Sequence, residues 1–288
     1  KQGLMMIYLF NIMETKKHEH KVYNAIECCT FRKTKELYGG LSNMASGFPL
    51  KVNDIHILTS EALYQTCRFP HLPEVQEKII KEKSPMSAKM VSKPFRNNSR
   101  PDWDFTRIKI MRWCLKVKLA QNFSLFGKLL ESTFNKPIIE DSNKDDFWGA
   151  IRDKQDANIL RGTNALGRLL MELRQFYNEK RYCYEMFVVE PLNIPDFKLF
   201  GQQIDTIDER ESFISFIKKS TRYFEIENLK IWKPKEKEYA KVETGHSIVS
   251  EKEVNQDKQE EEDKISKKKT AKSTKMKNIN DGQTTLPF

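Results

Sequence analysis

Between residues 59 and 180, apolar side chains recur mainly at the three- and four-residue spacing of amphipathic helices. This pattern constrains the fold more than any other feature of the chain. The two strongest segments predict helices at 104–122 and 167–180. Further helices are predicted at 59–69, 73–83, 84–91, 125–131 and 208–219.

Strand-like patterns are shorter and lie mostly before this region. Residues 22–26 and 28–31 are β-prone, and residues 50–57 predict a hairpin that turns at Asn53-Asp54. Residues 184–189 also predict a strand. The expected fold class is therefore mainly α with a small β element, an α+β domain.

The two ends of the chain differ in composition from its middle. Residues 4–12 are apolar but too short to span a bilayer, so residues 1–19 are interpreted as an N-terminal extension. Met13 is either an internal residue or the true start. From Pro234 onward apolar residues thin out, and an acidic run at 251–263 precedes a lysine-rich run at 264–277. Such a segment cannot bury enough apolar surface to offset its ordering entropy, so residues 234–288 are predicted to be disordered.

These boundaries predict a catalytic domain at 20–182. Residues 183–233 then form an appended α/β segment, which is either a small subdomain or a wrap onto the main one.

Charge and cysteine content narrow the function classes. The net charge of +10 favours an anionic partner such as nucleic acid or a nucleotide. The five cysteines are scattered and form no CxxC pair, which argues against a zinc site or a disulfide framework and favours a reducing cytoplasm. No dinucleotide-binding or P-loop motif is present, so no cofactor and no metal are expected.

Six short blocks stand out, and five of them place a carboxylate, Asn, Lys or Arg beside an aromatic, glycine or small residue. The six blocks are Gly39–Met44, Thr59–Gln65, Ser84–Lys89, Pro101–Asp104, Asp145–Gly149 and Gly162–Arg168. Such a mixture suits a pocket that holds a sugar-phosphate and transfers a proton.

The order and spacing of the blocks resemble the NADAR family of N-glycosidases, over roughly half of the chain. The resemblance implies an orthogonal helical domain and hydrolysis of an N-glycosidic bond to ribose. Two positions depart from the family pattern: Ala62 stands where members carry His, and Arg68 where they carry Lys. A role for either family side chain cannot be transferred to this chain.

Three residues are the candidates for catalysis. Glu61 matches the family's Ser-Glu block and begins a helix, where a negative charge is stabilised; alternatively, it is only a capping acid. Lys89 follows the Ser-Pro turn and either attacks an opened ribose as a Schiff-base nucleophile, pairs with a phosphate, or is a surface lysine. Asp146 stands beside Trp148, where it could steady an oxocarbenium-like ribose.

Ligand contacts are expected from the same blocks. Tryptophan offers a flat surface for a base or ribose, and a glycine after it permits close approach of a ligand. The start of the 167–180 helix, with Asn164 and Arg168, predicts a phosphate cradle; the alternative is an ordinary glycine-containing turn. The candidate ligand-binding residues are Asn43, Tyr64, Gln65, Trp103, Trp148, Gly149, Asn164 and Arg168.

Of the two substrates that the family resemblance implies, ADP-ribose attached to guanine in DNA is preferred, because the positive charge, the lysine-rich tail and the clamp-like end suit DNA. The alternatives are a ribosylaminopyrimidine phosphate of riboflavin synthesis and a non-catalytic module that binds ADP-ribose and DNA. The final residues resemble sliding-clamp-binding peptides, with Gln283, Leu286 and Phe288 as contacts, so a sliding clamp is an expected partner and a membrane is not.

Overall fold

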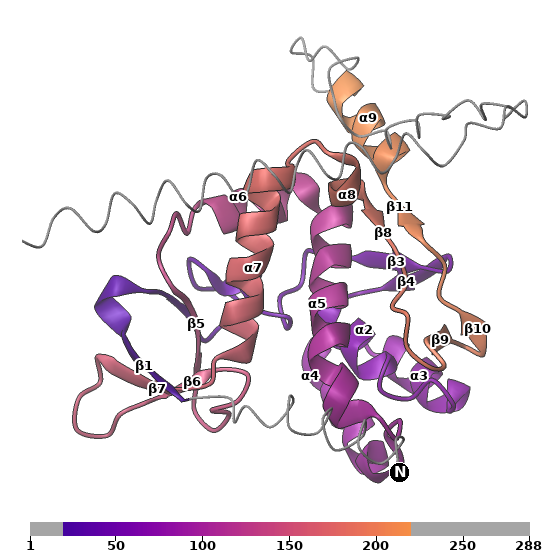
Figure 1. Ribbon diagram of the computed structural model, residues 1–288. Helices are drawn as coiled ribbons and strands as arrows, with labels where there is room; N and C mark the ends of the chain where they lie inside the picture. The colour runs from indigo at the N-terminus through magenta and orange to yellow at the C-terminus, as the bar shows by residue number, and fades with distance from the viewer. Residues whose placement is uncertain (1–19, 220–288) are drawn as a thin grey trace, which may run out of the picture. The chain divides into compact units, whose positions relative to one another are not determined.

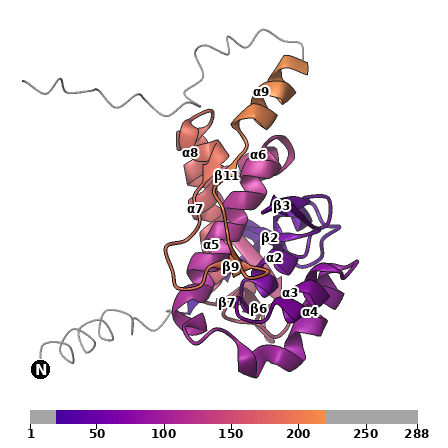
Figure 2. The ribbon, with the colours of Figure 1, turned by 90° about the vertical axis from the view of Figure 1, so that its right-hand side faces the viewer.

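The computed structural model describes residues 20–219 (Figure 1). Its longest helix, α5 (Trp103–Gln121), contacts both the α2–α4 side of the molecule and the α6–α8 side (Figures 1 and 2). The other helices are α2 (Ser60–Thr66), α3 (Pro73–Ile80), α4 (Pro85–Ser92), α6 (Phe123–Glu131), α7 (Ala165–Lys180), α8 (Tyr184–Phe187) and α9 (Arg210–Lys219), with short 3-10 turns at Ala25–Glu27, Gly39–Leu41 and Lys93–Asn98.

Local sequence explains where several helices begin. The Thr59 hydroxyl accepts a hydrogen bond from the Ala62 N–H at 3.2 Å and caps α2. Helix α4 begins in the same way, with Ser84 as the cap and Pro85 at the first helical position. These caps confirm the predicted starts of both helices, and the predicted long helices differ from α5 and α7 by only one or two residues at their ends.

A five-stranded sheet lies beside α7 in the order β1-β7-β6-β5-β2. The β1/β7 and β6/β7 pairs are antiparallel, whereas the β5/β6 and β2/β5 pairs are parallel. The strands are β1 (Lys21–Asn24), β2 (Cys29–Phe31), β5 (Ile138–Ser142), β6 (Ala150–Arg152) and β7 (Ile159–Gly162). The hairpin β3 (Leu50–Val52) and β4 (Ile55–Ile57) turns at Asn53 and Asp54, both with positive φ, as predicted.

The sheet is curled, because its two edge strands are close in the sequence. Only residues 25–28 separate β1 from β2. This link can span roughly 17 Å, whereas four strand spacings in a flat sheet need about 19 Å. Ile139, Ala150 and Leu160 fill the curl as a small separate cluster.

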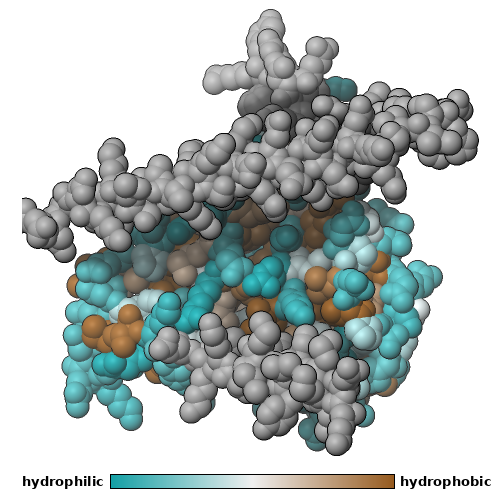
Figure 3. Space-filling view, viewed as in Figure 1, coloured by the Kyte–Doolittle hydropathy of each residue, from teal (hydrophilic) through white to brown (hydrophobic). Residues whose placement is uncertain are grey.

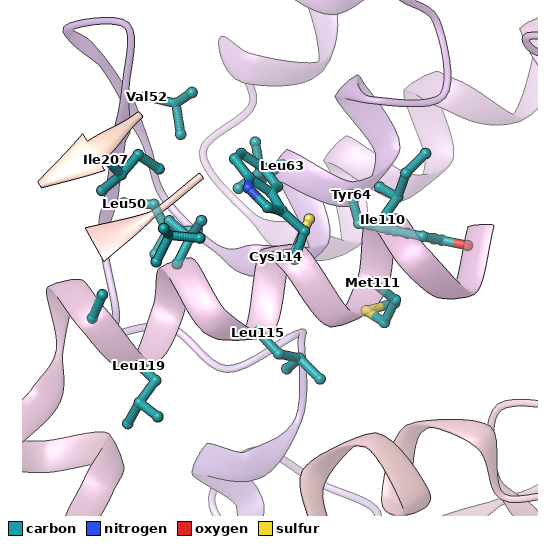
Figure 4. Close-up of a cluster of buried hydrophobic side chains, with 14 of the residues drawn as sticks. Leu50, Val52, Leu63, Tyr64, Ile110, Met111, Cys114, Leu115, Leu119 and Ile207 are labelled. Carbon is teal, nitrogen blue, oxygen red and sulfur yellow. The ribbon is translucent and has the colours of Figure 1, made fainter. Parts of the chain in front are cut away.

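The main hydrophobic core surrounds α5. Figure 4 shows its Ile110, Cys114 and Leu119 among side chains from α2, from β3 and from the distant strand β11. Helix α5 is buried along much of its length and contacts α2, which places the N-terminal end of α5 beside that helix.

Asn164 joins the sheet to α7. It adopts a left-handed conformation with φ of 51°, and its side-chain amide donates to the Ile138 carbonyl while its oxygen accepts from the Glu140 N–H. Gly149 and Gly167 pack so closely against β5 that a Cβ on either would lie within 2.4 Å of a β5 carbonyl oxygen. The junction thus fixes β5 against the beginning of α7.

Residues 183–219 wrap onto the main core. The segment contains α8, α9 and the strands β8 (Val188–Val189), β9 (Lys198–Leu199), β10 (Gln202–Gln203) and β11 (Ile207–Asp208). Phe197 makes an edge-to-face contact with Trp113 of α5, and Phe213 stacks on Phe187 with ring centroids 4.1 Å apart. The prediction of a strand over 184–189 was wrong for its first four residues: 184–187 form a helical turn, and only 188–189 pair with β11.

Candidate active site

A cavity of about 380 Å³ opens between α2, α4, the first half of α5 and the segment that follows β5. It draws on all six blocks identified in the sequence, although the Gly162–Arg168 block contributes only Leu166. Its lining residues are Ser42, Asn43, Met44, Glu61, Tyr64, Gln65, Arg68, Lys89, Arg96, Trp103, Asp104, Arg107, Met111, Glu140, Ser142, Asp145, Phe147, Trp148 and Leu166.

Glu61 is held in this cavity by a chain of hydrogen bonds. Its backbone N–H donates to the Asn43 carbonyl at 3.1 Å, and its carboxylate accepts from the Gln65 amide at 2.9 Å. The Gln65 oxygen in turn accepts from the Ser92 hydroxyl at 2.9 Å. Because Thr59 caps the helix, the carboxylate of Glu61 is turned toward the cavity with only 6% of the residue exposed.

A buried lysine holds the loop that carries Asn43 by hydrogen bonds to two of its backbone carbonyls. Lys118 donates from Nζ to the carbonyls of Gly40 and Ser42 at 2.8 and 3.1 Å. Burial lowers the pKa of Lys118 to about 7, whereas the rings of Phe48 and Phe126, both within 4.4 Å of Nζ, favour its charged form.

Four aromatic residues line the cavity, and the rings of three of them, Tyr64, Trp103 and Trp148, pack against one another. The Tyr64 ring lies between Trp103 and Trp148, with centroid distances of 5.1 and 5.7 Å. Burial raises the pKa of Tyr64 well above its ordinary value, with a further contribution from Glu61, so its phenol stays protonated at neutral pH. A flat ring surface with a hydroxyl at its edge suits a nucleobase or a ribose.

Carboxyl groups gather around Glu140 at the end of β5. Burial, followed by the nearby charges of Asp145 and Glu61, raises the pKa of Glu140 to about 7, while Lys89 acts in the opposite direction. Asp145 is fixed because it accepts hydrogen bonds from the N–H groups of Phe147 and Trp148 at 3.1 and 2.8 Å. We call Glu61, Glu140 and Asp145 the carboxylate group.

A second group, which we call the arginine group, consists of Arg68, Arg96 and Arg107. Burial lowers the pKa of Arg68 and the charges of Arg96 and Arg107 lower it further, whereas Tyr64 and Asp104, which also line the cavity, act in the opposite direction. Arg68 donates to the Ser99 hydroxyl at 2.6 Å and lies 4.7 Å from the Trp103 ring centroid. Arg107 lies 4.0 Å from the Phe147 ring centroid, and its buried Nε has no hydrogen-bond partner within residues 20–219.

No ion pair within 4.0 Å neutralises the arginine group in the described part of the chain. Tyr64 interacts electrostatically with Glu61 of the carboxylate group and with Arg68 and Arg107 of the arginine group. The cavity therefore brings together three arginine side chains, an aromatic surface and three carboxyl groups.

Comparison with known proteins identifies the family. The NADAR domain profile matches residues 30–177, about half of the chain. This chain belongs to the NADAR domain family. N-glycosidase YbiA of Escherichia coli is 32% identical over 145 residues, covering 50% of this chain and 85% of YbiA. A solution structure of E. coli YbiA matches at a TM-score of 0.45 and 30% identity, and covers 57% of this chain and 92% of the other.

Two further relatives are named as riboflavin biosynthesis proteins. The riboflavin biosynthesis protein VVA0006 of Vibrio vulnificus is 33% identical over 147 residues, but the match covers only 38% of that protein. The chloroplastic riboflavin biosynthesis protein PYRR of Zea mays is 32% identical over 158 residues, covering 24% of its length. In both cases half of this chain is matched.

Seven of the predicted site residues line the cavity described above: Asn43, Glu61, Tyr64, Gln65, Lys89, Trp103 and Trp148. Asp146 does not line it. Its carboxylate is 53% exposed and lies 3.8 Å from His20 Nε2, and the acid that the turn directs into the cavity is its neighbour Asp145. Gly149 does not line the cavity either; it packs against β5.

The predicted phosphate cradle at the start of α7 is wrong. The N–H groups of Thr163, Asn164, Ala165 and Leu166 donate to carbonyls of residues 146–149, at 2.6 to 3.0 Å. Because both amide atoms of Asn164 bind β5, its role is structural. Arg168 lies outside the cavity lining, and the clamp-like residues Gln283, Leu286 and Phe288 lie outside the described residues.

Sequence interpretation missed Arg96, Arg107, Glu140 and Asp145 as cavity residues. Glu140 lies in β5 directly after two isoleucines, and Arg107 occupies the second turn of α5; neither position is marked by a motif. Asp145 could have been considered, because the Asp145-Asp146 pair contains two equivalent candidates.

Within residues 20–219, no cluster of three or more His, Cys, Asp or Glu side chains is placed to hold a metal ion. In the same residues, no helix has both the length and the apolar character needed to cross a membrane.

Proposed function

We propose that this protein is an N-glycosidase that hydrolyses the bond between a ribose and a nucleobase, with ADP-ribose on guanine in DNA as its substrate. The observation that carries the proposal is the division of the cavity into an arginine group, an aromatic surface and a carboxylate group. The anionic phosphates of the substrate would bind the arginine group, and its planar base would stack on the aromatic surface. The scissile C1′–N bond would then lie beside the carboxylate group.

The carboxylate group supplies the proton transfers. With its pKa near 7, Glu140 is partly protonated at neutral pH and can donate a proton to the departing base nitrogen. The carboxyl group of Glu61, fixed by Gln65, is positioned to stabilise the oxocarbenium-like ribose or to accept a proton from the attacking water. The C1′–N bond breaks, water adds its oxygen to C1′, and one water proton replaces the proton given by Glu140.

Lys89 offers a second route to the same products. Its amine could displace the base at C1′; opening of the ribose ring then gives an iminium between Nζ and C1′, which water hydrolyses. Lys89 lines the cavity and interacts electrostatically with Glu140, so either this role or phosphate binding is compatible with its position.

Borohydride separates these routes, because it reduces an iminium to a stable secondary amine. If Lys89 acts as the nucleophile, borohydride added during turnover attaches ribose covalently to the wild type and not to Lys89→Ala. Direct hydrolysis gives no adduct, and Lys89→Ala then retains turnover with weaker binding.

DNA is favoured over a free metabolite by the +10 net charge of the chain. A guanine in a duplex would need extrusion into the cavity, so single-stranded DNA is the simpler substrate. Relatives named for riboflavin biosynthesis support a ribosylaminopyrimidine phosphate as the second candidate.

One experiment tests the proposed function and its alternatives. The full chain is incubated with a single-stranded oligonucleotide that carries ADP-ribose on guanine and, separately, with a ribosylaminopyrimidine phosphate. Chromatography should show release of ADP-ribose from the first and little cleavage of the second, with Glu61→Gln as the inactive control. Preferential cleavage of the pyrimidine substrate would reverse the substrate assignment. Binding of ADP-ribose without cleavage of either would indicate a non-catalytic module.

A further inference from the structure

A second cavity, of about 440 Å³, lies on another face of α5 from the active site. It is formed by α5, α7, α8 and the segment that follows α8, elements that contact one another in the structure. Figures 1 and 3 show this face between α5 and α7, where hydrophilic side chains form a broad band in the part that grey atoms do not cover. We call this cavity the α5–α7 groove.

Helical spacing places a basic stripe in this groove. Lys109, Arg112 and Lys116 are separated by three and four residues, so they project from the same face of α5. All three line the groove. Arg112 is held by Glu172 at 2.9 Å, whereas Lys109 and Lys116 have no carboxylate within 4.0 Å among residues 20–219.

The acids of the groove are already engaged. Glu185 forms an ion pair with Lys180 at 2.8 Å, and Glu190 accepts a hydrogen bond from the Thr206 hydroxyl. Glu190, like Lys109 and Lys116, has no ion-pair partner among residues 20–219, because a threonine hydroxyl is neutral. The two lysines outnumber this one carboxylate, so the unpaired charge of the groove is positive on balance and favours an anionic ligand.

Aromatic rings are interleaved with these cations. Phe176 of α7 lies 5.0 Å from the Lys116 ammonium, and Tyr184 of α8 also lines the groove. The buried Trp113 forms part of the wall and is fixed by its Nε1, which donates to the Glu190 carbonyl at 3.0 Å. Cations that bind phosphates beside rings on which bases stack are the usual combination for single-stranded nucleic acid.

The stripe also leads toward the active site. Phe105 lies on the same face, four residues before Lys109, is 57% exposed, and follows the cavity residue Asp104. The distance along α5 from Phe105 to Lys116 is about 16 Å, enough for roughly four or five stacked nucleotides at about 3.4 Å each.

We propose that the α5–α7 groove binds single-stranded nucleic acid, and that a strand lying along α5 from this groove reaches the rim of the active site. The nucleic-acid part rests on the groove itself, whereas the connection to the modified base rests on the proposed function. An acidic protein segment would suit the lysines but would make no use of the stacking rings.

The test measures binding of the full chain to an unmodified, fluorescently labelled 15-nucleotide single strand by anisotropy over a range of salt concentrations. The groove variant is Lys109→Glu with Lys116→Glu. Its matched control is Lys35→Glu with Lys154→Glu, which makes the same charge change at exposed positions outside the groove. Circular dichroism confirms that both variants are folded.

We expect the groove variant to lose at least tenfold more affinity than the control. Its plot of log K against log salt should be shallower than that of the wild type by about 1.4, the contribution of two phosphate contacts on a single strand. Equal losses in the two variants would mean that only bulk charge matters and would overturn the proposal.

Stacking is tested separately at Tyr184. Tyr184→Ala should weaken single-strand binding about 5- to 150-fold, while Tyr184→Phe should bind nearly as well as the wild type. A polyglutamate peptide should bind weakly and be indifferent to Tyr184→Ala. If that peptide binds as tightly as the oligonucleotide, the groove is a site for acidic proteins.

The outcome is independent of catalysis. The groove variant should cleave an ADP-ribosylated guanine mononucleotide like the wild type but show a raised KM on a modified oligonucleotide. Loss of single-strand binding with an unchanged oligonucleotide KM would separate the groove from the active site. Absence of all cleavage by the wild type would refute the proposed function while leaving the binding result intact.

Discussion

The carboxylate group and the arginine group share one cavity but differ in how the protein holds them. Glu61 and Asp145 are fixed by hydrogen bonds from an amide and from backbone N–H groups. The arginine group is held mainly against Ser99 and the rings of Trp103 and Phe147, without ion pairs to acids in the described chain. Under the proposed function, this difference corresponds to acids that are positioned for the chemical step and arginines that are available to bind an anionic ligand.

The largest effect is expected at Glu61. Glu61→Gln removes the carboxyl group and keeps the size of the side chain, and the new amide can still interact with Gln65. Loss of one acid–base group typically lowers kcat by ~100- to 10,000-fold, and KM should change little because the arginine group is intact. Steady-state kinetics measures both values. An unchanged kcat would indicate that Asp145, Glu140 or Lys89, and not Glu61, carries out the chemical step.

Arg107→Gln should have the opposite signature. Removal of one charge-assisted hydrogen bond of about 1.5–3 kcal/mol should raise KM about 10- to 150-fold and leave kcat nearly unchanged. The variant should be no less stable than the wild type to thermal unfolding, because it relieves repulsion from Arg68. Arg161→Gln, on β7 outside the cavity, is the control. A drop in kcat at constant KM would place Arg107 in the chemical step.

The raised pKa of Glu140 predicts a smaller effect, a decrease of folding stability with rising pH. Its pKa is about 7 in the folded protein and ordinarily 4.5, so the folded state binds more protons between these values. Stability should therefore fall as pH rises from about 4.5 through 7, by on the order of 2 kcal/mol. Glu140→Gln should lack this loss.

Urea denaturation at pH 5 and pH 8 checks the difference between the wild type and Glu140→Gln. The wild-type kcat should also decline as pH rises through 7, because the general acid loses its proton. Parallel stability curves for the two proteins would show that Glu140 is solvated like an ordinary surface acid.

Sequence patterns predicted the helical framework and half of the site, for identifiable reasons. Helix α5 and the β3–β4 hairpin are determined locally, by apolar spacing and by an Asn-Asp turn. Glu61, Tyr64 and Gln65 were found together because one short helix presents them all.

The remaining predictions failed where tertiary packing decides the outcome. Strands β5–β7 were missed because they are short and β5 ends in polar residues that the curled sheet and α7 accommodate. Asp145 and Asp146 are adjacent, and only the turn that fixes Asp145 on two N–H groups determines which acid enters the cavity. The cradle at α7 failed because neighbouring carbonyls occupy its N–H groups.

The most direct test of the central claim is single-turnover cleavage of an ADP-ribosylated guanine oligonucleotide, with enzyme raised to saturation for each protein. The account predicts that saturated Arg107→Gln cleaves at close to the wild-type rate, while saturated Glu61→Gln remains at least ~100-fold slower. A slow Arg107→Gln enzyme at saturation, or a Glu61→Gln enzyme that matches the wild type, would contradict the division of the cavity into a binding part and a chemical part.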